Sequence, residues 1–585
     1  MSSWLEKFAA RPQRAILLLS LALLLAGNWI LPLTDRDETR FAEASREMLQ
    51  RGDFVVPWFN GAWRFDKPVL IYWCQMASYK VFGENDFAAR LPSVLFTTAT
   101  ALLLVRWGRK FADAKTAFMA GAMFVAGLHV AIIGRVATAD MAMVFFTTLA
   151  VWSGWELTRP PINSTPSPRP NGERVGVRGF ESKNNRTSSP QPSPPLHGRE
   201  GETQNSRRKR WWWIFYVTLA LGFLAKGPVA WLPLGGLITG RVLRRDSFRL
   251  PLNETVVGLS LTVALASLWA LPALDQTNWQ YLFVGLGEHV IHRSTGVIDG
   301  HGFAGMLGFI ALLPLYFLTF FVSFFPWSMR FQSETEMFDS FDSLCLRLTG
   351  RNIKSQTKWN NLIEKNNSYR DQFQILKVVM MAVASFAFVP SRILRWFGNS
   401  KSDCAGWYLL LQAALVFVVF SCVRTKLPHY TMPAFPCIAL WLAMQLGREQ
   451  NSCAWFNRRL AAMSIIILAL MLGGFAIARN YLLTENLWRE VKASVRLETK
   501  IGCFGYTEPS LVWKFRSVTT NLVTLGDVKR AKDFLTNAPP FILVLPTSEL
   551  TNWPTVGGAQ FRVRGLDMVK FKNRDLTAIV RDAKP

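Results

Sequence analysis

The chain has 585 residues, of which 50% are hydrophobic and only 18% charged, and it contains 43 Phe and 23 Trp. This composition excludes an ordinary soluble enzyme, because apolar runs of about 18–22 residues, long enough to cross about 30 Å of hydrocarbon, recur along most of the chain. The net charge of +26 comes from basic residues that flank these runs as orientation signals do, so we expect no nucleic-acid partner. The seven Cys are scattered without CxxC spacing, so neither a zinc ribbon nor a disulfide framework is indicated.

Eleven segments are predicted to span the membrane. They lie near residues 16–33, 88–106, 114–134, 139–157, 211–225, 228–243, 254–274, 303–326, 406–423, 430–446 and 460–478. The first follows Lys7, Arg11 and Arg14 and has no small-residue cleavage site, which predicts an uncleaved span and a cytoplasmic N-terminus. The odd number of crossings then places residues 479–585 outside.

Three other segments are read from composition. Residues 159–210 hold nine of the 30 Pro among polar residues, which predicts a disordered cytoplasmic insertion. Residues 331–403 form a second cytoplasmic insertion, interpreted as loop expansion or as a partner-binding loop. Residues 374–391 within it are apolar, and we expect an interfacial or re-entrant helix because one more crossing would break the parity.

The C-terminal residues 479–585 change character. Strand-like segments such as VRLETKIGCFGYTEPSLVWKF, PPFILVLPTSEL and LDMVKFKNRDLTAIVRD are separated by one helical stretch, 525–537. The sequence therefore predicts a mainly α polytopic membrane protein, with a transmembrane domain over 1–478 and a small α/β domain outside the membrane over 479–585.

Ionisable residues gather at the predicted outer ends of the spans and in the outer loops. They are Asp35, Asp37, Glu38, Arg40, Asp66, Lys67, Arg135, Asp140, Lys226, Glu288, His289, His292, Arg293, Arg424, Lys426 and His429, with Tyr430 beside them. A transporter would instead carry ionisable residues near the middle of its spans. A polar site at the outer leaflet suits a substrate with a lipid tail and an anionic head group.

The first outer loop, 34–87, is the most informative stretch. Phe41, Ala44 and Met48 recur at helical spacing, which predicts a short helix along the membrane surface. Asp37 and Glu38 open this helix, where the exposed N–H groups favour ionised carboxylates. The pair is therefore either a base or cation-stabilising group or simply a helix cap.

The run DRDETRFAEASREMLQRGDFVVPWFNGAWRFDKPVLIYWCQMASYKVFGENDFAARLPS resembles the first outer loop of the bacterial lipid A aminoarabinose transferases. These belong to the protein mannosyltransferase-like family of C-type glycosyltransferases. The resemblance continues through GRVATAD, LAKGP, TKLPHYTMPAFP and GYTEPSLVW. It implies a C-type fold with about 11–13 transmembrane helices, and an inverting enzyme that takes a sugar from a polyprenyl phosphate on the outer face of the inner membrane.

The resemblance also implies roles for residues. Asp37 matches the principal catalytic carboxylate, with Glu38 in support and Asp140 as a second carboxylate, whereas Lys67, Arg40 and Lys226 are expected to contact the donor phosphate. His429, Tyr430 and Glu508 are expected to line the substrate pocket. Two departures from the family pattern are Asp66 where Glu is usual and Phe41 where Tyr is common.

Asp66, His289 and His292 are candidate ligands for a divalent metal, zinc or magnesium. Histidines at this spacing are also common as hydrogen-bonded loop residues, so both interpretations stay open.

The function we expect is transfer of 4-amino-4-deoxy-L-arabinose from undecaprenyl phosphate to a lipid A phosphate at the periplasmic face, with membrane lipids as the surrounding partner. One alternative is transfer of mannose or another hexose to a protein or glycan hydroxyl. Another is transport of the lipid-linked sugar without transfer.

Overall fold

The computed structural model describes residues 8, 10–158, 197–243, 251–292, 315–331, 404–449, 452–518, 522–537, 539–552 and 558–582. The part of the predicted disordered insertion that precedes residue 197, nearly all of the second insertion with its apolar segment 374–391, and the first half of the predicted span 303–326 lie outside these residues.

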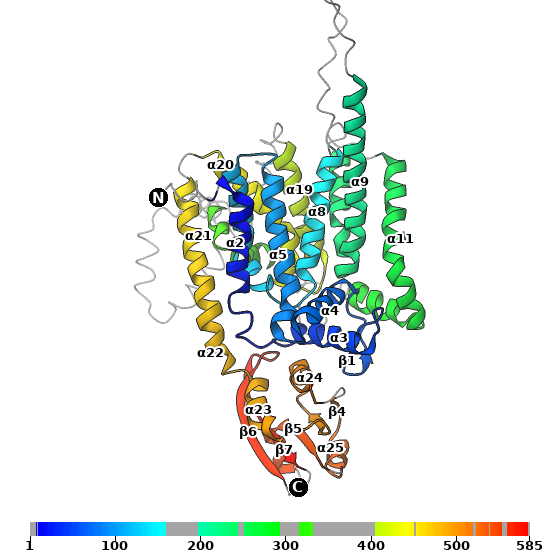
Figure 1. The fold of residues 1–585 in the computed structure, drawn as a ribbon, viewed down its shortest axis with the longest axis vertical. Helices are drawn as coiled ribbons and strands as arrows, with labels where there is room; N and C mark the ends of the chain where they lie inside the picture. The colour runs from blue at the N-terminus through cyan, green and yellow to red at the C-terminus, as the bar shows by residue number, and fades with distance from the viewer. Residues whose placement is uncertain are drawn as a thin grey trace, which may run out of the picture.

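The membrane part is a bundle of helices (Figure 1). Its elements are α2 (Pro12–Leu25), α5 (Asp86–Gly108), α6 (Ala114–Val125), α7 (Leu128–Ile133), α8 (Asp140–Thr158), α9 (His197–Lys226), η1 (Gly227–Trp231), α10 (Leu232–Leu243), α11 (Leu252–Gln276), α12 (Gln280–Leu282), η2 (Phe283–His292), α15 (Leu315–Ser323), η3 (Trp327–Phe331), α19 (Cys404–Cys422), η6 (Pro428–Ala434), α20 (Phe435–Gly447), α21 (Ser452–Ala469), η7 (Leu470–Gly474) and α22 (Phe475–Arg479). Most of the longer helices overlap predicted spans, but α2 ends at Leu25, before the predicted end of the first span at residue 33.

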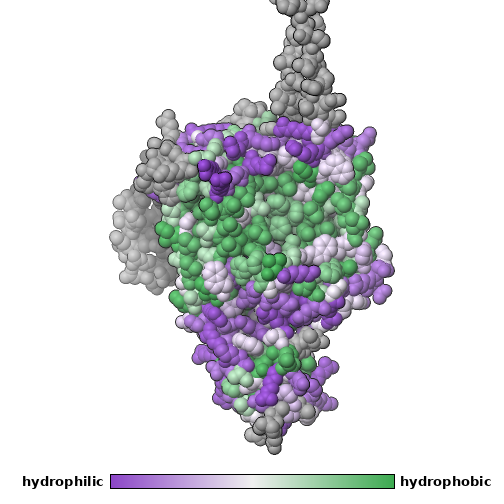
Figure 2. Space-filling view, viewed as in Figure 1, coloured by the Kyte–Doolittle hydropathy of each residue, from purple (hydrophilic) through white to green (hydrophobic). Residues whose placement is uncertain are grey.

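Five helical stretches in the described part of the chain are long and apolar enough to cross a membrane. They are Asp86–Gly108, Ser206–Leu243, Leu252–Gln276, Cys404–Cys422 and Ser452–Arg479. Apolar side chains such as Leu268 on α11 and Ile465 on α21 are 74% and 67% exposed, and Figure 2 shows a hydrophobic belt across one face of the bundle with polar surfaces above and below it. The belt matches a lipid environment, and the chain is a multi-pass membrane protein as predicted.

One predicted boundary is wrong. We expected residues 159–210 to be disordered, but α9 begins at His197, so the last part of this segment is helical. Arg208 forms a bidentate ion pair with Glu254 of α11, at 2.6 and 2.7 Å, which ties this extension to the neighbouring helix. The polar residues before Trp211 predicted a loop. Composition alone does not show that the apolar helix which follows extends back through them.

The first outer loop lies between the bundle and the C-terminal domain (Figure 1). It contains α3 (Asp37–Arg51), the two-stranded hairpin β1 (Trp58–Phe59) and β2 (Ala62–Trp63), and α4 (Leu70–Phe82). The predicted apolar stripe of α3 is confirmed, because Phe41, Ala44 and Met48 are buried in one cluster against α4. The helix ends at Gly52, whose φ of 67° is left-handed and whose N–H closes the last turn.

The C-terminal domain contains α23 (Leu483–Val491), η8 (Lys492–Ser494), β3 (Lys500–Phe504), α24 (Pro509–Phe515), β4 (Val523–Leu525), α25 (Val528–Phe534), β5 (Phe541–Pro546), η9 (Thr547–Asn552), β6 (Ala559–Asp567) and β7 (Lys572–Arg581). Its sheet has the order β4-β3-β5-β7-β6, in which β3 is parallel to β4 and β5 whereas β7 is antiparallel to β5 and β6. A small α/β domain was predicted, but the segment EPSLVWKF, read as strand-like, forms α24 instead. Pro509 at its first position favours this helix start.

Candidate active site

The two carboxylates at the start of α3 have opposite environments. Asp37 is exposed and, among the described residues, makes no side-chain hydrogen bond or ion pair. Glu38 is only 3% exposed. Its carboxylate forms a bidentate ion pair with Arg90 of α5, with both N···O distances at 2.8 Å, and accepts further bonds from Thr34 and from the Ala137 N–H at 3.0 Å.

Arg90 extends this network to the chain that leaves the first span. Its guanidinium donates to the carbonyl oxygens of Asn28, Leu31 and Pro32 at 3.0, 2.6 and 3.1 Å. Burial by itself raises the pKa of Glu38, but Arg90 and the backbone N–H groups outweigh it and hold that pKa below its usual value. Glu38 therefore has no acceptor capacity left for a substrate, and its position favours a structural role that fixes the start of α3.

The second carboxylate, Asp140, is the first residue of α8 and pairs with Lys226 at the end of α9. Thr138 donates a hydrogen bond to the same carboxylate at 2.8 Å. The Lys226 ammonium lies 5.9 Å from the ring centre of Tyr430, so it is held between a carboxylate and an aromatic face. Two residues from loops far apart in the sequence are thus brought together as the outer-loop pattern predicted.

His429 joins this centre from η6. Asp140, Lys226, His129 and Asp37 all lie close enough to influence its charge. His429 therefore lies within electrostatic range of Asp37 from the first loop, Asp140 from GRVATAD and Lys226 from LAKGP.

Two basic residues, Arg40 and Arg64, also lie within electrostatic range of Asp37. Arg64 forms an ion pair with Asp66 at 2.7 Å and donates to the Tyr72 hydroxyl at 3.3 Å. Arg40 is half-buried and lies within electrostatic range of Arg64, Asp66 and Asp37. This concentration of positive charge beside an exposed carboxylate is suited to an anionic phosphate.

Lys67 lies in the same loop. The Lys67 ammonium donates to the Asp66 carbonyl at 3.0 Å, and the Tyr281 hydroxyl donates to the Lys67 carbonyl at 2.5 Å. The backbone at Lys67 is therefore fixed from α12.

The metal prediction rests on side chains that the structure describes only in part. Asp66 is engaged by Arg64, and the side chains of His289 and His292 lie outside the described set although their backbone forms η2. Within the described ranges, no three His, Cys, Asp or Glu side chains form a group suited to a metal. A bound metal stays a prediction.

Glu508 approaches the site from the C-terminal domain. It is the residue before α24, is half-buried, and lies within electrostatic range of Asp35, Arg36 and Arg40 of the first loop. Burial and the nearby Asp35 raise the pKa of Glu508 above its ordinary value, although Arg36 and Arg40 oppose this. Glu508 therefore lies near the first loop, and its place in a substrate pocket stays a prediction.

Sequence reasoning missed two partners. Arg90 occurs in FAARLPS, within the resembling run, but nothing in its local spacing points to Glu38, 52 positions earlier. Ser510 was part of the EPSLV motif, yet its hydrogen bonds to Asp35 span 475 positions and depend on how the C-terminal domain docks.

Comparison with known proteins agrees with this geometry. Residues 66–159 match the family model described as dolichyl-phosphate-mannose-protein mannosyltransferase. An uncharacterised protein of Aquifex aeolicus (strain VF5) is 24% identical over 462 residues, which cover 78% of this chain and 77% of that protein. The undecaprenyl phosphate-alpha-4-amino-4-deoxy-L-arabinose arabinosyl transferase of Yersinia enterocolitica is 38% identical over 138 residues, which cover 22% of this chain and only 25% of that enzyme.

The fold is shared with a solved enzyme. The crystal structure of ArnT from Cupriavidus metallidurans bound to undecaprenyl phosphate has a TM-score of 0.63 and 15% identity, with all of both chains covered. These matches confirm the predicted resemblance and the polytopic fold. The family match over residues 66–159, together with the local identity to the arabinosyl transferase, indicates a glycosyltransferase that uses a polyprenyl-phosphate-linked sugar, and the solved structure shows the shared fold.

Proposed function

We propose that the chain is an inverting transferase that moves 4-amino-4-deoxy-L-arabinose from undecaprenyl phosphate to a lipid A phosphate at the periplasmic face of the inner membrane. The observation that carries the proposal is the exposed Asp37 carboxylate, which lies within electrostatic range of both His429, beside the Asp140–Lys226 pair, and the basic residues Arg40 and Arg64. The local identity to arabinosyl transferases supports this choice of sugar.

In this reaction an oxygen of the acceptor phosphate attacks the anomeric carbon of the sugar. The new C–O bond forms as the bond to undecaprenyl phosphate breaks, and the bonding electrons leave with the undecaprenyl phosphate. Positive charge from Arg40 and Lys67 stabilises the phosphate as this negative charge develops.

Asp37 has a specific part in this step. An acceptor phosphate, with a second pKa of roughly 6, is already anionic near neutral pH, so it needs no general base. Asp37 therefore orients the sugar or stabilises the positive charge that develops on its ring. The amine of the sugar is suited to an acidic partner, for which Asp140 and Glu508 are the candidates.

The experiment is mass spectrometry of lipid A from a host that makes the donor but lacks its own aminoarabinose transferase, with and without this chain. We expect a mass gain of one aminopentose per modified phosphate, and no gain with Asp37→Asn at equal membrane expression. An unmodified lipid A with folded wild-type protein in the membrane would contradict the proposed donor and acceptor.

Transfer of mannose or another hexose to a hydroxyl is the second candidate, favoured by the description of the family that matches residues 66–159. It would require Asp37 to act as a true base. Supplying the purified protein with polyprenyl-phosphate mannose and a hydroxyl acceptor distinguishes the two candidate functions. Transfer of mannose to the hydroxyl is expected only for the second.

A further inference from the structure

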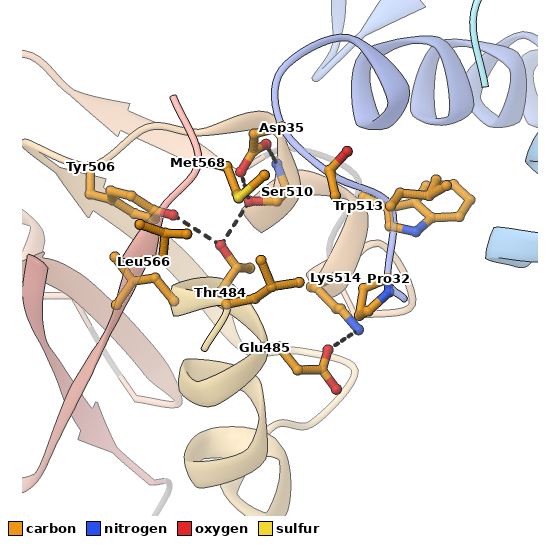
Figure 3. A pocket seen from close by; sticks show the side chains of 14 residues that line it. Pro32, Asp35, Thr484, Glu485, Tyr506, Ser510, Trp513, Lys514, Leu566 and Met568 are labelled. Atoms are coloured by element: carbon orange, nitrogen blue, oxygen red, sulfur yellow. Dashed lines mark hydrogen bonds and ion pairs between the residues drawn. The ribbon is translucent and has the colours of Figure 1, made fainter. Parts of the chain in front are cut away.

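A continuous hydrogen-bonded chain connects the C-terminal domain to the start of α3 (Figure 3). The Asp35 carboxylate accepts from the Ser510 N–H at 2.7 Å and from the Ser510 hydroxyl at 2.5 Å. The Ser510 hydroxyl lies 2.7 Å from the Thr484 hydroxyl, which lies 3.0 Å from the Tyr506 hydroxyl. Ser510, Thr484 and Tyr506 are all buried, so the chain of bonds is shielded from water.

Asp35 is also bonded to α3 itself. The single proton of the Thr39 hydroxyl is shared between the Asp35 carboxylate and the Arg36 carbonyl, each 3.3 Å from the hydroxyl oxygen. Thr39 follows Asp37 by two residues in the first turn of the helix. The same carboxylate therefore holds the C-terminal domain on one side and the turn that carries Asp37 on the other.

α24 also packs against α3, but the other hydrogen bonds between the C-terminal domain and the rest of the chain attach away from this first turn. The Trp513 indole N–H donates to Asp86 at 2.7 Å, the Arg516 guanidinium donates to the Glu84 carbonyl at 3.0 Å, and Asn60 pairs with the backbone of Leu522 at 2.7 and 2.8 Å. Among the described residues these bonds connect the domain to the start of α5 and to the hairpin loop. These hydrogen bonds can therefore be removed without touching the bonds at Asp35.

We propose that the Asp35–Ser510 pair is a positioning element of the active site, through which the C-terminal domain fixes the first turn of α3 and so the direction of the Asp37 carboxylate. The C-terminal domain is then part of the catalytic architecture. The proposal rests on the proposed function for its kinetic consequence, but its structural part stands on the hydrogen bonds alone.

Two details support positioning over simple attachment. Asp35 offers both carboxylate oxygens to a single residue, so the pair fixes orientation as well as distance. The same helix start brings Glu508 within electrostatic range of Arg40, so a displacement of α24 would move charge at the site as well.

The first test is hydrogen–deuterium exchange on the full-length protein in lipid nanodiscs, which does not depend on activity. We expect Asp35→Ala and Ser510→Ala to raise the exchange of the amides of residues 36–41 about tenfold. Asn60→Ala, which removes the bonds to Leu522 outside α24, serves as the matched control and should leave them unchanged. Unchanged exchange in Ser510→Ala, or an equal rise in all three variants, would overturn the proposal.

The second test is kinetic, with undecaprenyl-phosphate-linked aminoarabinose as donor and lipid A as acceptor. Ser510→Ala and Asp35→Ala should lower kcat about tenfold with the donor KM unchanged. Asp35→Asn should restore kcat, because its amide oxygen accepts from the Ser510 N–H and its NH2 donates to the Ser510 hydroxyl.

An Asp35→Asn variant as slow as Asp35→Ala would contradict the hydrogen-bond account. If wild-type protein transfers no sugar while the exchange pattern is as expected, the proposed function fails and the positioning element stands. The two failures are therefore distinguishable.

Discussion

The two buried carboxylate centres of the outer surface, Glu38–Arg90 and Asp140–Lys226, use the same kinds of residue in different ways. The Glu38 carboxylate accepts hydrogen bonds from Arg90, Thr34 and Ala137, which lie in three separate segments. The remaining N–H groups of Arg90 donate to backbone carbonyl oxygens. Asp140 meets one ammonium and one hydroxyl, and that ammonium faces the Tyr430 ring.

The difference teaches that burial and charge do not by themselves mark a catalytic group. A carboxylate whose lone pairs are all used within the protein holds structure together, whereas one with fewer protein donors keeps acceptor capacity for a substrate. Asp37, exposed one residue before Glu38, makes the contrast within a single helix turn.

The largest effect is expected from Arg90→Met, which leaves the Glu38 carboxylate buried without its cation. Breaking a buried ion pair in this way should lower the free energy of unfolding by about 3 kcal/mol. The double variant Glu38→Gln with Arg90→Met should recover part of this loss, because no unpaired charge remains. Thermal unfolding in detergent followed by tryptophan fluorescence measures both, and equal midpoints for wild type and Arg90→Met would contradict a structural role.

Asp140→Asn should affect sugar transfer more than stability, the reverse of what is expected for Arg90→Met. We expect transfer to fall at least about 100-fold because Lys226 loses the carboxylate that fixes it, whereas the unfolding midpoint moves much less than with Arg90→Met. Single-turnover sugar transfer with saturating donor measures the loss. Near-normal transfer would place Asp140 with the structural carboxylates.

Lys67→Ala should give a smaller loss of transfer, of about tenfold to 100-fold, because one of several positive charges near the donor phosphate is removed. Lys80→Ala is the matched control, since Lys80 is exposed on α4 and its ammonium lies over the Phe54 ring. Steady-state kinetics over a range of donor concentrations should show the loss for Lys67→Ala alone. Equal losses would point to a general effect of loop charge.

The smallest expected effect is a pH dependence at Asp35. Burial raises its pKa to about 6, against an ordinary value of 3.8, although the Ser510 and Thr39 bonds oppose the shift. The folded protein thus binds this proton more tightly than the unfolded chain, so Asp35 makes the protein more stable as pH falls from about 6 toward 4 and less stable as pH rises through 6.

Asp35→Asn removes this titration but keeps the hydrogen bonds. At pH 7.5 it should match or exceed wild-type stability by of order 1 kcal/mol, and the difference should shrink toward pH 5. The groups that face Asp35 are Arg36, Thr39, Glu508, Ser510, Tyr506 and Asp567. A difference that grows as pH falls would contradict the shift.

Much of the membrane fold was predictable, because spans such as 88–106 and 406–423 are set by local apolar length, and the structure has helices there. Local periodicity also predicted α3 correctly. It failed for α24, whose short apolar run resembles a strand, and for the start of α9, whose composition resembles a loop. The convergence of Asp140, Lys226 and His429 followed from placing all three at one membrane face.

What the sequence could not supply is the division of labour between Asp37 and Glu38. The two residues are adjacent and both suit a helix N-terminus, so their propensities are alike. The division depends on Arg90, a partner whose contact spans 52 positions.

The most direct measurement of the central claim is a comparison of Asp37→Asn with Glu38→Gln in purified protein, following sugar transfer and unfolding in the same preparations. Asp37→Asn should lower the rate of transfer about 100-fold or more, with an unchanged unfolding midpoint. Glu38→Gln should lower the midpoint, by about 3 kcal/mol in free energy, and lose activity only as far as the protein unfolds. A stable Glu38→Gln protein without transfer, beside an active Asp37→Asn protein, would reverse the two roles and contradict the account.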